Sequence, residues 1–342
     1  MNWDLAIVGC GYWGKNIVRV FSELKKENIF LGDVILFDVN QDRSKELSKQ
    51  YKFKLAPSFE EILINKKIKS VLIITPSSSH YSLSKRALEA GKNVFVEKPF
   101  TLDSNKAREL IDLAKKMDLI LMVGMIFRFH QGILELKKRL DLGEFGKILF
   151  MYGTKFGYSV PNEDAGVIFT LAINDFDIYC FLTGTEYPET ISANRGSFLQ
   201  EDLEEIASIC LTYPENVHSY FIESWLVPVF DRHRMMYLVG TNKTAVIDYL
   251  KPNEIDIYDA KIKKEILDDR MLFKMEKNPM QKVILDFKEP LKEEMKHFII
   301  CVTNKEKSFS DGIVGYRAVK MCELALKSAK LGKKIIVKDE IE

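Results

Sequence analysis

A glycine-rich loop near the N-terminus constrains the fold of this chain more than any other feature. The loop reads Gly9-Cys10-Gly11-Tyr12-Trp13-Gly14, follows the apolar run Leu5–Val8 and precedes a helical pattern over Ile17–Lys26. A strand, a G-x-G-x-x-G turn and a helix in this order are typical of a dinucleotide-binding unit, because the glycines let the backbone turn tightly and approach a pyrophosphate closely. The residues expected to contact the dinucleotide are Gly9, Gly11, Tyr12, Trp13 and Gly14.

An acidic residue at the end of the second predicted strand indicates which dinucleotide binds. Asp38 directly follows the run Val34–Phe37. A carboxylate at this place accepts hydrogen bonds from the hydroxyls of the adenosine ribose and repels a 2′-phosphate. NAD is therefore favoured over NADP, although Arg43 is close enough in sequence to weaken this preference.

The first part of the chain alternates short β-branched runs with amphipathic segments, which is typical of parallel βαβ units. The predicted strands are Leu5–Val8, Val34–Phe37, Val71–Ile74, Val94–Val96 and Leu119–Val123. Because these runs are apolar on both faces, helices must cover both sides of the sheet. We expect a Rossmann-type, doubly wound α/β domain over residues 1–124.

Beyond Gly146 the pattern changes to longer runs rich in β-branched and aromatic residues. The runs are Ile148–Tyr158, Thr190–Phe198, Ile206–Tyr213, Val217–Val227, Met235–Val239 and Thr244–Tyr249, with helical patterns over Val167–Leu182, Glu289–Asn304 and Val314–Leu331. We expect a second, α+β domain over residues 125–342 with a large, open, mostly antiparallel sheet, the last helix packing back on the first domain. An uncovered sheet face would suit assembly into a homodimer or homotetramer.

Charge, apolar runs and cysteines exclude several classes of protein. Lys and Arg number 50 and Asp and Glu 49, so a net charge of +1 gives no general attraction to nucleic acid or to a membrane surface. The longest apolar stretch, Leu119–Phe127, is about half the length of a membrane-spanning helix. Five scattered cysteines form no C-x-x-C pair, so neither disulfides nor a metal site are expected. The N-terminus lacks the features of a signal peptide, and we expect a cytoplasmic protein.

The tripeptide Glu97-Lys98-Pro99 is a candidate catalytic segment. It follows the run Val94–Val96, at the carboxyl edge of the sheet where ligands bind in such folds. Glu97 and Pro99 would fix the backbone direction of Lys98, and the Lys98-Pro99 bond can be cis. Burial lowers the pKa of a lysine, which lets it exchange a proton with a substrate hydroxyl near neutral pH. A solvated surface lysine is the alternative.

Together these motifs resemble the Gfo/Idh/MocA oxidoreductases. The matching segments are the glycine loop, Asp38, Thr75-Pro76 with His80, Gly91–Pro99, Arg128-Phe129-His130, Asp175-Phe176-Asp177, Tyr316-Arg317 and Gly332-Lys333-Lys334, which span nearly the whole chain. The resemblance implies hydride transfer between a nicotinamide cofactor and a sugar, polyol or related carbonyl compound. It also implies that the cofactor is contacted by Thr75, Pro76, His80, Glu97 and Lys98.

Two segments are similar to the branch of this family that acts on nucleotide sugars. They are the glycine loop continued as Gly14-Lys15-Asn16, and Phe127-Arg128-Phe129. This similarity implies oxidation at C3 of a UDP-N-acetylglucosamine or of its uronic acid. Arg232 and Arg234 could donate to a UDP diphosphate, or they could belong to a basic surface strand.

Two positions depart from the family pattern. Where the family usually has an Asp and, four residues later, a His on one helix, this chain has Thr170 and Asn174. A spacing of four places both side chains on one helical face, so they can hydrogen-bond a sugar hydroxyl, but neither takes up a proton at physiological pH. The candidates for the missing base are Lys98, which ranks first, and His130, Tyr158 and Asp175. Asp175 and Asp177 could equally be structural, and a lone histidine such as His130 is more often structural than catalytic.

The leading hypothesis is an NAD-dependent dehydrogenase of a nucleotide sugar with Lys98, Asn174 and Asp175 as catalytic residues. The residues expected to contact the substrate are Lys98, Arg128, Tyr158, Thr170, Asn174, Asp175, Arg232 and Arg234. The alternative is a family member that has lost catalysis and acts as an NAD(H)- or sugar-binding regulatory protein. An active oxidoreductase with a different carbonyl substrate lies between the two.

Overall fold

The computed structural model describes residues 3–229, 231–267 and 270–341, which divide into two compact units. The first unit comprises Met1–Ile126 and Pro290–Lys320, and the second comprises Phe127–Glu289 and Met321–Glu342. The chain therefore returns to the first unit after most of the second has been completed. No helix among the described residues is long and apolar enough to cross a membrane.

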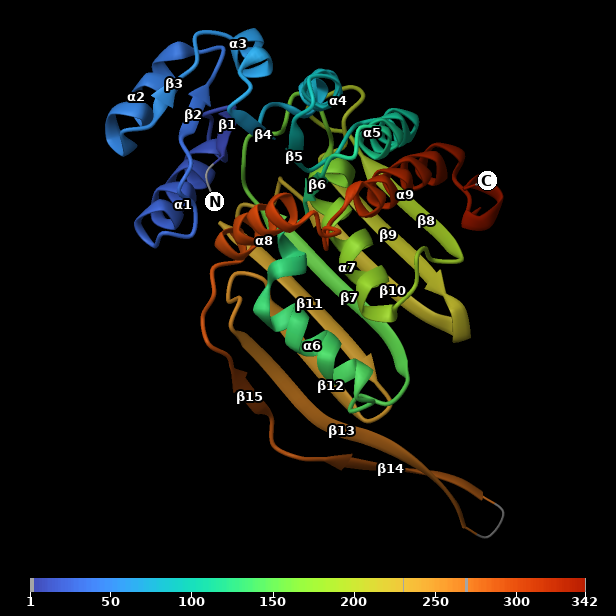
Figure 1. The fold of residues 1–342 in the computed structure, drawn as a ribbon. Coiled ribbons are helices and arrows are strands. Elements are labelled where there is room, and N and C mark those ends of the chain that lie inside the picture. Colours follow the sequence, from blue (N-terminus) through green and yellow to red (C-terminus); the bar gives the residue numbers. More distant parts are fainter. Residues whose placement is uncertain (1–2, 230, 268–269, 342) are drawn as a thin grey trace. The chain divides into compact units, whose positions relative to one another are not determined.

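A six-stranded parallel sheet in the order β3-β2-β1-β4-β5-β6 forms the centre of the first unit (Figure 1). The strands are β1 (Asp4–Val8), β2 (Val34–Phe37), β3 (Lys54–Leu55), β4 (Ile68–Ile73), β5 (Asn93–Glu97) and β6 (Leu121–Gly124), and the helices are α1 (Gly14–Lys26), α2 (Gln41–Tyr51), α3 (Phe59–Ile64), α4 (Ser77–Glu89), α5 (Ser104–Lys116) and α8 (Pro290–Asn304). Successive residues of β1, such as Leu5, Ala6 and Ile7, are fully buried, which shows that both faces of the sheet are covered. The predicted doubly wound Rossmann fold is confirmed. Its strand order reverses between β1 and β4, and ligands bind at the carboxyl ends of the strands at such a point.

The second unit is built on a ten-stranded sheet in the order β14-β13-β12-β11-β7-β10-β9-β8-β16, with β15 paired to β13 off this path. The strands are β7 (Ile148–Gly157), β8 (Thr190–Gly196), β9 (Ile206–Tyr213), β10 (Val217–Ser224), β11 (Arg232–Gly240), β12 (Lys243–Asp248), β13 (Glu254–Leu267), β14 (Arg270–Lys277), β15 (Gln281–Ile284) and β16 (Ile335–Ile336). The pair β7–β10 is parallel and the other pairs are antiparallel. The predicted mostly antiparallel sheet is therefore confirmed.

Helices α6 (Gln131–Asp141) and α7 (Ile173–Thr183) lie over one face of this sheet (Figure 1). A π-helical turn over Ile168–Ala172 leads into α7. The long helix α9 (Gly312–Leu331) begins in the first unit and ends in the second. The sequence pattern did not predict α6, nor the three strands β13 to β15.

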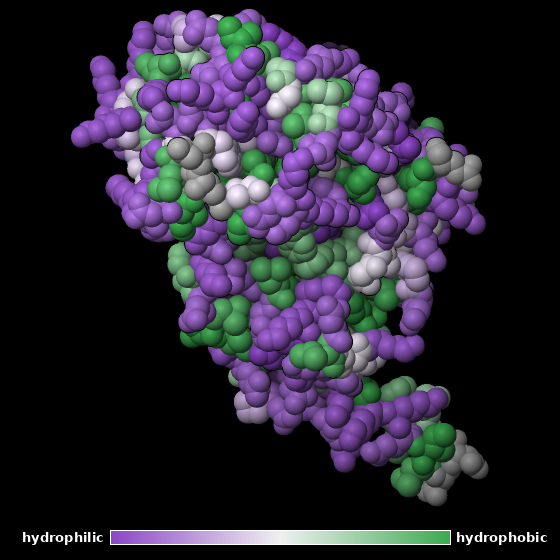
Figure 2. All heavy atoms as spheres, viewed as in Figure 1, coloured by the Kyte–Doolittle hydropathy of each residue, from purple (hydrophilic) through white to green (hydrophobic). Residues whose placement is uncertain are grey.

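A hairpin arm, defined as residues 260–267 of β13 and residues 270–277 of β14, extends from the edge of the second sheet (Figure 1). Its strand register places mostly charged side chains on one face and mostly apolar side chains on the other. The exposed apolar residues on that face are Ile262, Ile266, Met271, Phe273 and Met275. Figure 2 shows hydrophobic side chains gathered at the far end of this arm. Because an isolated two-stranded hairpin is marginally stable in water, the arm gains from being covered.

Candidate active site

The glycines between β1 and α1 meet different steric limits. Gly9 has a φ of +102°, and a Cβ there would lie 2.3 Å from the carbonyl oxygen of Ile74. A Cβ on Gly14 would lie 2.1 Å from the carbonyl oxygen of Gly9, whereas one on Gly11 would meet no atom within 4 Å. The loop is thus packed tightly where it turns and is open at Gly11, where its backbone precedes a helix N-terminus. This arrangement fits a pyrophosphate.

Asp38 is held beside this loop by two backbone hydrogen bonds. Its Oδ2 accepts from the backbone N–H of Cys10 at 2.6 Å, and its Oδ1 accepts from that of Asn40 at 2.7 Å. Burial, together with the charge of Asp38, raises the pKa of the Cys10 thiol to about 12, so Cys10 stays protonated. The carboxylate therefore lies at the carboxyl end of β2 in a fixed orientation, as a ribose-binding group requires.

Glu97 connects the glycine loop to the predicted catalytic lysine. Its Oε1 accepts from the indole N–H of Trp13 at 2.5 Å, and its Oε2 accepts from the backbone N–H of Lys98 at 3.1 Å. Burial raises the pKa of Glu97 to about 7, against the opposing influence of the Lys98 charge and of these hydrogen bonds. The Lys98-Pro99 peptide bond is cis. Lys98 itself is partly exposed at the end of β5, next to a carboxyl group that changes its charge near neutral pH.

A second buried carboxyl group, Glu294 of α8, lies near Glu97. Phe298, one helical turn after Glu294, packs edge-on against Phe95 of β5 at 5.8 Å between ring centroids. Glu294 is fully buried, and neither of its carboxyl oxygens has a hydrogen-bond partner among the described residues. Burial, and next the charge of Glu97, raise the pKa of Glu294 well above its usual value. Burial therefore favours the neutral, protonated form of Glu294 in the folded protein.

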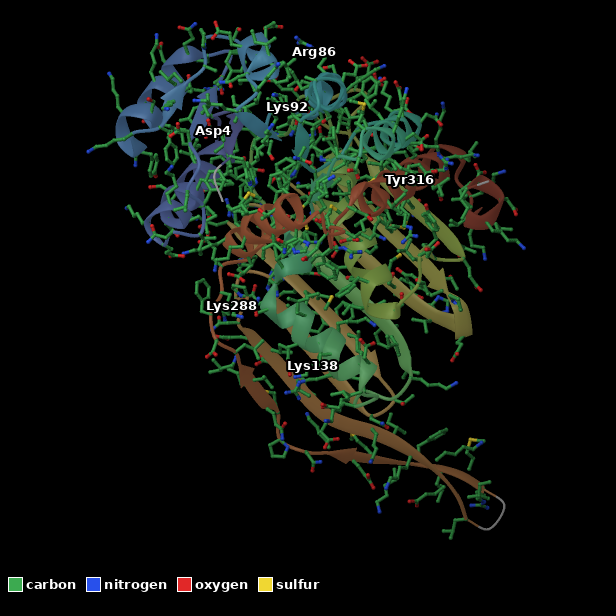
Figure 3. The ribbon with its side chains drawn as sticks, in the orientation of Figure 1. Asp4, Arg86, Lys92, Lys138, Lys288 and Tyr316 are labelled. Atoms are coloured by element: carbon green, nitrogen blue, oxygen red, sulfur yellow. The ribbon has the colours of Figure 1, made fainter. Side chains whose placement is uncertain are left out.

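His80 and Lys92 are buried side chains that hold loops of the first unit together. The two ring nitrogens of His80 lie 2.7 Å from the carbonyl oxygen of Pro99 and 2.8 Å from that of Thr75, which ties the loop after β4 to the loop after β5. Lys92, labelled in Figure 3, donates to the carbonyl oxygens of Asn65 and Ile68 at 2.7 and 2.8 Å. Lys92 is thereby buried and held by two backbone carbonyl groups, whereas Lys98 is partly exposed.

The candidate residues of the second unit surround a buried lysine that the sequence analysis missed. Lys155 of β7 is 1% exposed, donates a short hydrogen bond to Asp175 of α7 and lies 3.4 Å from Glu223 of β10. The strand register places Arg234 of β11 on its other side, so Arg234, Lys155 and Glu223 form one row across three strands. Burial raises the pKa of Glu223 well above its usual value in spite of the nearby Lys155 charge. The sequence did hold a signal for Lys155, because the alternation of side chains along β7 places this lysine on the inward-facing side of the strand.

Asp177 and Arg128 form a forked ion pair. The guanidinium of Arg128 makes three contacts of 2.7 to 3.0 Å with the Asp177 carboxylate, which is 5% exposed. This pair joins the start of the second unit to α7.

The side chains at the two positions that depart from the family pattern bond to nearby backbone. Thr170 donates to the carbonyl oxygen of Gly166 at 2.8 Å, and Asn174 donates to the carbonyl oxygen of Leu171 at 3.2 Å.

His130 has a structural environment. It is 1% exposed, and its Nδ1 accepts from the backbone N–H of Ile133 at 3.3 Å, which caps the N-terminus of α6. Burial lowers the pKa of His130 to about 4, so the ring stays neutral near physiological pH.

Tyr158 is largely exposed and, together with Arg232 and Arg234, lines a small cavity at the ends of β7 and β11. The residues expected to bind the cofactor thus lie in the first unit, and the remaining substrate candidates besides Lys98 lie in the second.

Two family models match this chain. A Gfo/Idh/MocA model described as an oxidoreductase family with an NAD-binding Rossmann fold matches residues 4–125. A second Gfo/Idh/MocA model, described as the C-terminal alpha/beta domain of the oxidoreductase family, matches residues 137–337. The two matches together span most of the chain and correspond to its parallel and antiparallel sheets.

Individual relatives include named sugar and polyol dehydrogenases. The chain is 28% identical to UDP-N-acetylglucosamine 3-dehydrogenase of Acidithiobacillus ferrooxidans over 253 residues, which are 74% of this chain and 75% of that protein. It is 26% identical to scyllo-inositol 2-dehydrogenase (NAD(+)) of Bacillus subtilis over 318 residues, 87% of this chain and 86% of that protein.

Solved structures share the fold. The structure of the Acidithiobacillus ferrooxidans dehydrogenase matches with a TM-score of 0.77 at 23% identity, covering 97% of this chain and 98% of that one. Levoglucosan dehydrogenase in complex with NADH matches with a TM-score of 0.83 at 17% identity, covering 98% and 99%. At these identities the likeness concerns the fold alone.

Proposed function

The chain belongs to the Gfo/Idh/MocA oxidoreductase family, and from this premise we propose that it transfers hydride between NAD and C3 of a UDP-N-acetylglucosamine-type nucleotide sugar. The cofactor follows from the NAD-binding Rossmann domain, whose loop is open at Gly11 and flanked by the oriented Asp38. The sugar is supported by the similarity to UDP-N-acetylglucosamine 3-dehydrogenase. The observation that carries the proposal is the position of Lys98, which directly follows β5 next to a Glu97 that bonds to the glycine loop.

Lys98 binds the reacting hydroxyl and accepts its proton in this proposal. Bound NAD supplies the hydride acceptor. For Lys98 to act as a base its own proton must leave, and Glu97, whose burial raises its pKa to about 7, can take up a proton at physiological pH. Holding the hydroxyl and the cofactor together, and stabilising the developing alkoxide by a cation, supply most of the rate enhancement.

The second unit orients the sugar. Asn174 and Thr170 carry groups that can bond sugar hydroxyls, and Asp175 is fixed by Lys155. Arg128, oriented by Asp177, and Tyr158 are further contacts, and Arg232 and Arg234 face an anionic part of the substrate. His80, Thr75 and Pro76 shape the loop that packs against the cofactor, because His80 fixes the loop after β4.

Assembly into a homodimer or homotetramer is part of the proposal. The face of the second sheet opposite α6 and α7 carries partly exposed aromatic residues, among which Tyr152 and Tyr237 stack at 4.2 Å between ring centroids. The register continues this face along β13 onto the apolar face of the arm. A second copy covering both would remove a large apolar surface from water.

The test is turnover of purified protein with NAD and UDP-N-acetylglucosamine, followed by the absorbance of NADH. Lys98→Met should lower turnover by at least about a thousandfold, because it removes the proton acceptor and the cation at the alkoxide, while changing NAD affinity only a few-fold. Lys85→Met is the matched control, since Lys85 is partly exposed and pairs with Glu109 on the surface of the first unit. Turnover retained in Lys98→Met would remove Lys98 from the mechanism. Tight NAD binding without turnover of any sugar would favour the regulatory alternative.

A further inference from the structure

The hairpin arm has an open strand edge along β14. Among the residues that the structure describes, β14 pairs only with β13. β14 is eight residues long, so at about 3.3 Å per residue the arm extends roughly 25 Å from the rest of the sheet (Figure 1). The backbone N–H and C=O groups along this edge can therefore pair with a strand of another molecule. Such a strand would stabilise the arm, because a two-stranded ribbon is only marginally stable alone.

The side chains of β14 limit how this strand can pair with a second copy of itself. When two copies pair antiparallel about a two-fold axis, one residue lies opposite itself and the two apolar faces lie on the same side of the joined sheet. The two registers that pair the most residues of β14 are centred on Phe273 and on Lys274. The second register places Lys274 opposite its own copy, and like charges in this position are unfavourable.

The register centred on Phe273 is complementary in both charge and polarity. It places Arg270 opposite Glu276 of the partner subunit, twice by symmetry, and Met271 opposite Met275 of the partner subunit. Phe273 and Met275 are 68% and 75% exposed, so both are free to pack against another molecule. Glu276 lies 2.7 Å from Lys263 of β13, which holds its carboxylate on the charged face. Opposite charges and apolar side chains in cross-strand pairs stabilise a sheet.

The other edge of the arm does not fit a second copy in this way. The pairing of β12 with β13 ends at residue 259, so residues 260–267 are also open on that side. Registers centred on Lys263 or on Lys264 place that lysine opposite its own copy. A register centred on Ile262 places Lys261 opposite Lys263. Lysines along an open edge are a common means of preventing edge-to-edge pairing, which leaves β14 as the edge that fits.

We propose that two copies of this chain join edge to edge along β14, antiparallel, with Phe273 at the two-fold axis and an Arg270–Glu276 pair on each side of it. The joined arms form a four-stranded sheet, which meets the requirement of three or more strands with an apolar face for independent stability. Its apolar face is formed by Ile262, Ile266, Met271, Phe273 and Met275 of both copies. This inference specifies the assembly within the proposed function and does not depend on the cofactor, the sugar or Lys98.

The experiment measures the mass of the full chain by sedimentation equilibrium over a range of concentrations. Arg270→Glu and Glu276→Arg each replace two attractive pairs by two repulsive ones, so each should raise the dissociation constant of the arm interface by about tenfold or more. An equal mixture of the two variants should restore the parent's assembly, because every pair between the two chains is then again of opposite charge. Lys138→Glu is the control, since Lys138, labelled in Figure 3, is an exposed lysine of α6 outside the arm.

A cross-link tests the register. Phe273→Cys should form a covalent dimer on air oxidation, because residue 273 lies opposite itself. Met275→Cys, on the same face, should do so far less, because residue 275 lies opposite Met271 of the partner subunit. The five native cysteines are buried or partly buried and should give a low background in the parent.

The outcomes separate the pairing from the wider assembly. A parent that is monomeric at every concentration would overturn both the assembly and the pairing, and would leave the edge to a different partner. An assembled parent whose dissociation neither charge reversal changes would overturn the pairing alone. The same conclusion would follow if mixing the two variants restored nothing, if Phe273→Cys gave no covalent dimer, or if both cysteine variants cross-linked equally.

Discussion

Replacing Glu294 by glutamine should make the first unit more stable, and increasingly so as the pH rises. Glu294 is fully buried on α8, and its two carboxyl oxygens have no hydrogen-bond partner among the described residues. In the unfolded chain this side chain loses its proton near the ordinary glutamate pKa of 4.5, whereas in the folded protein burial and the charge of Glu97 raise that pKa well above this value. A glutamine has a similar shape and needs no proton.

The size of the effect follows from proton linkage. Above pH 4.5 the folded state holds a proton that the unfolded state has released, so the free energy of unfolding falls by about 1.4 kcal/mol for each unit of pH, up to the raised folded-state pKa. While the pH lies between these two pKa values, the parent therefore loses about 1.4 kcal/mol for each unit of pH that Glu294→Gln keeps. For a unit of this size, the difference in melting temperature should grow by roughly 3 to 6 °C for each unit of pH.

The assay is thermal unfolding of parent and variant at several pH values across this range. The difference in melting temperature should grow steadily with pH. Glu23→Gln is the control: Glu23 lies on α1 of the same unit, and hydrogen bonds from Arg19 and Lys292 lower its pKa, so it is ionised in both states over this range and its difference should stay flat. Parallel melting curves for Glu294→Gln and the parent would refute the reasoning that Glu294 is a buried neutral acid.

Two further predictions concern the second unit. Lys155→Met should destabilise this unit by about 3 kcal/mol or more, because it leaves the buried carboxylate of Asp175 without its cation. Adding Asp175→Asn should restore part of the loss, as measured by thermal unfolding of the single and double variants. An unchanged melting temperature in Lys155→Met would contradict the pairing. Lysines introduced at both Ile262 and Phe273, on the apolar face of the arm, should reduce the mass of the assembly measured by light scattering after size-exclusion chromatography. The control Lys263→Gln, on the charged face, should leave the mass unchanged. Identical masses for the parent, the double lysine variant and Lys263→Gln would exclude the arm from the interface.

The first unit could be predicted closely because its signals are local. The run Leu5–Val8 lies within β1, and the glycine loop and Asp38 lie at the carboxyl ends of β1 and β2, where the βαβ pattern places them. The burial of Glu294 also had a signal, since it lies three residues after Leu291 and four before Phe298, on the apolar stripe of its helix. Its proximity to Glu97 had none, because strands β6 to β15 lie between β5 and α8 in the sequence.

The second unit was harder to predict from the sequence, because the row formed by Arg234, Lys155 and Glu223 depends on the order of the strands. Lys155 meets Glu223 only through the parallel pairing of β7 with β10, and meets Arg234 only because β11 pairs with the other edge of β7. Neither pairing joins strands that are adjacent in sequence, so no local pattern predicts it. The arm was missed for a different reason: its strands alternate lysines with exposed apolar residues and have no buried face of their own.

The most direct test of the account is calorimetric titration of the cofactor-free protein with NAD and with NADP, for the parent and for Asp38→Ala. NAD should bind the parent at least about tenfold more tightly than NADP, because the fixed Asp38 carboxylate accepts hydrogen bonds from the ribose hydroxyls and repels a 2′-phosphate. Asp38→Ala should lose this preference. Absence of binding by either nucleotide, or tighter binding of NADP to the parent, would contradict it.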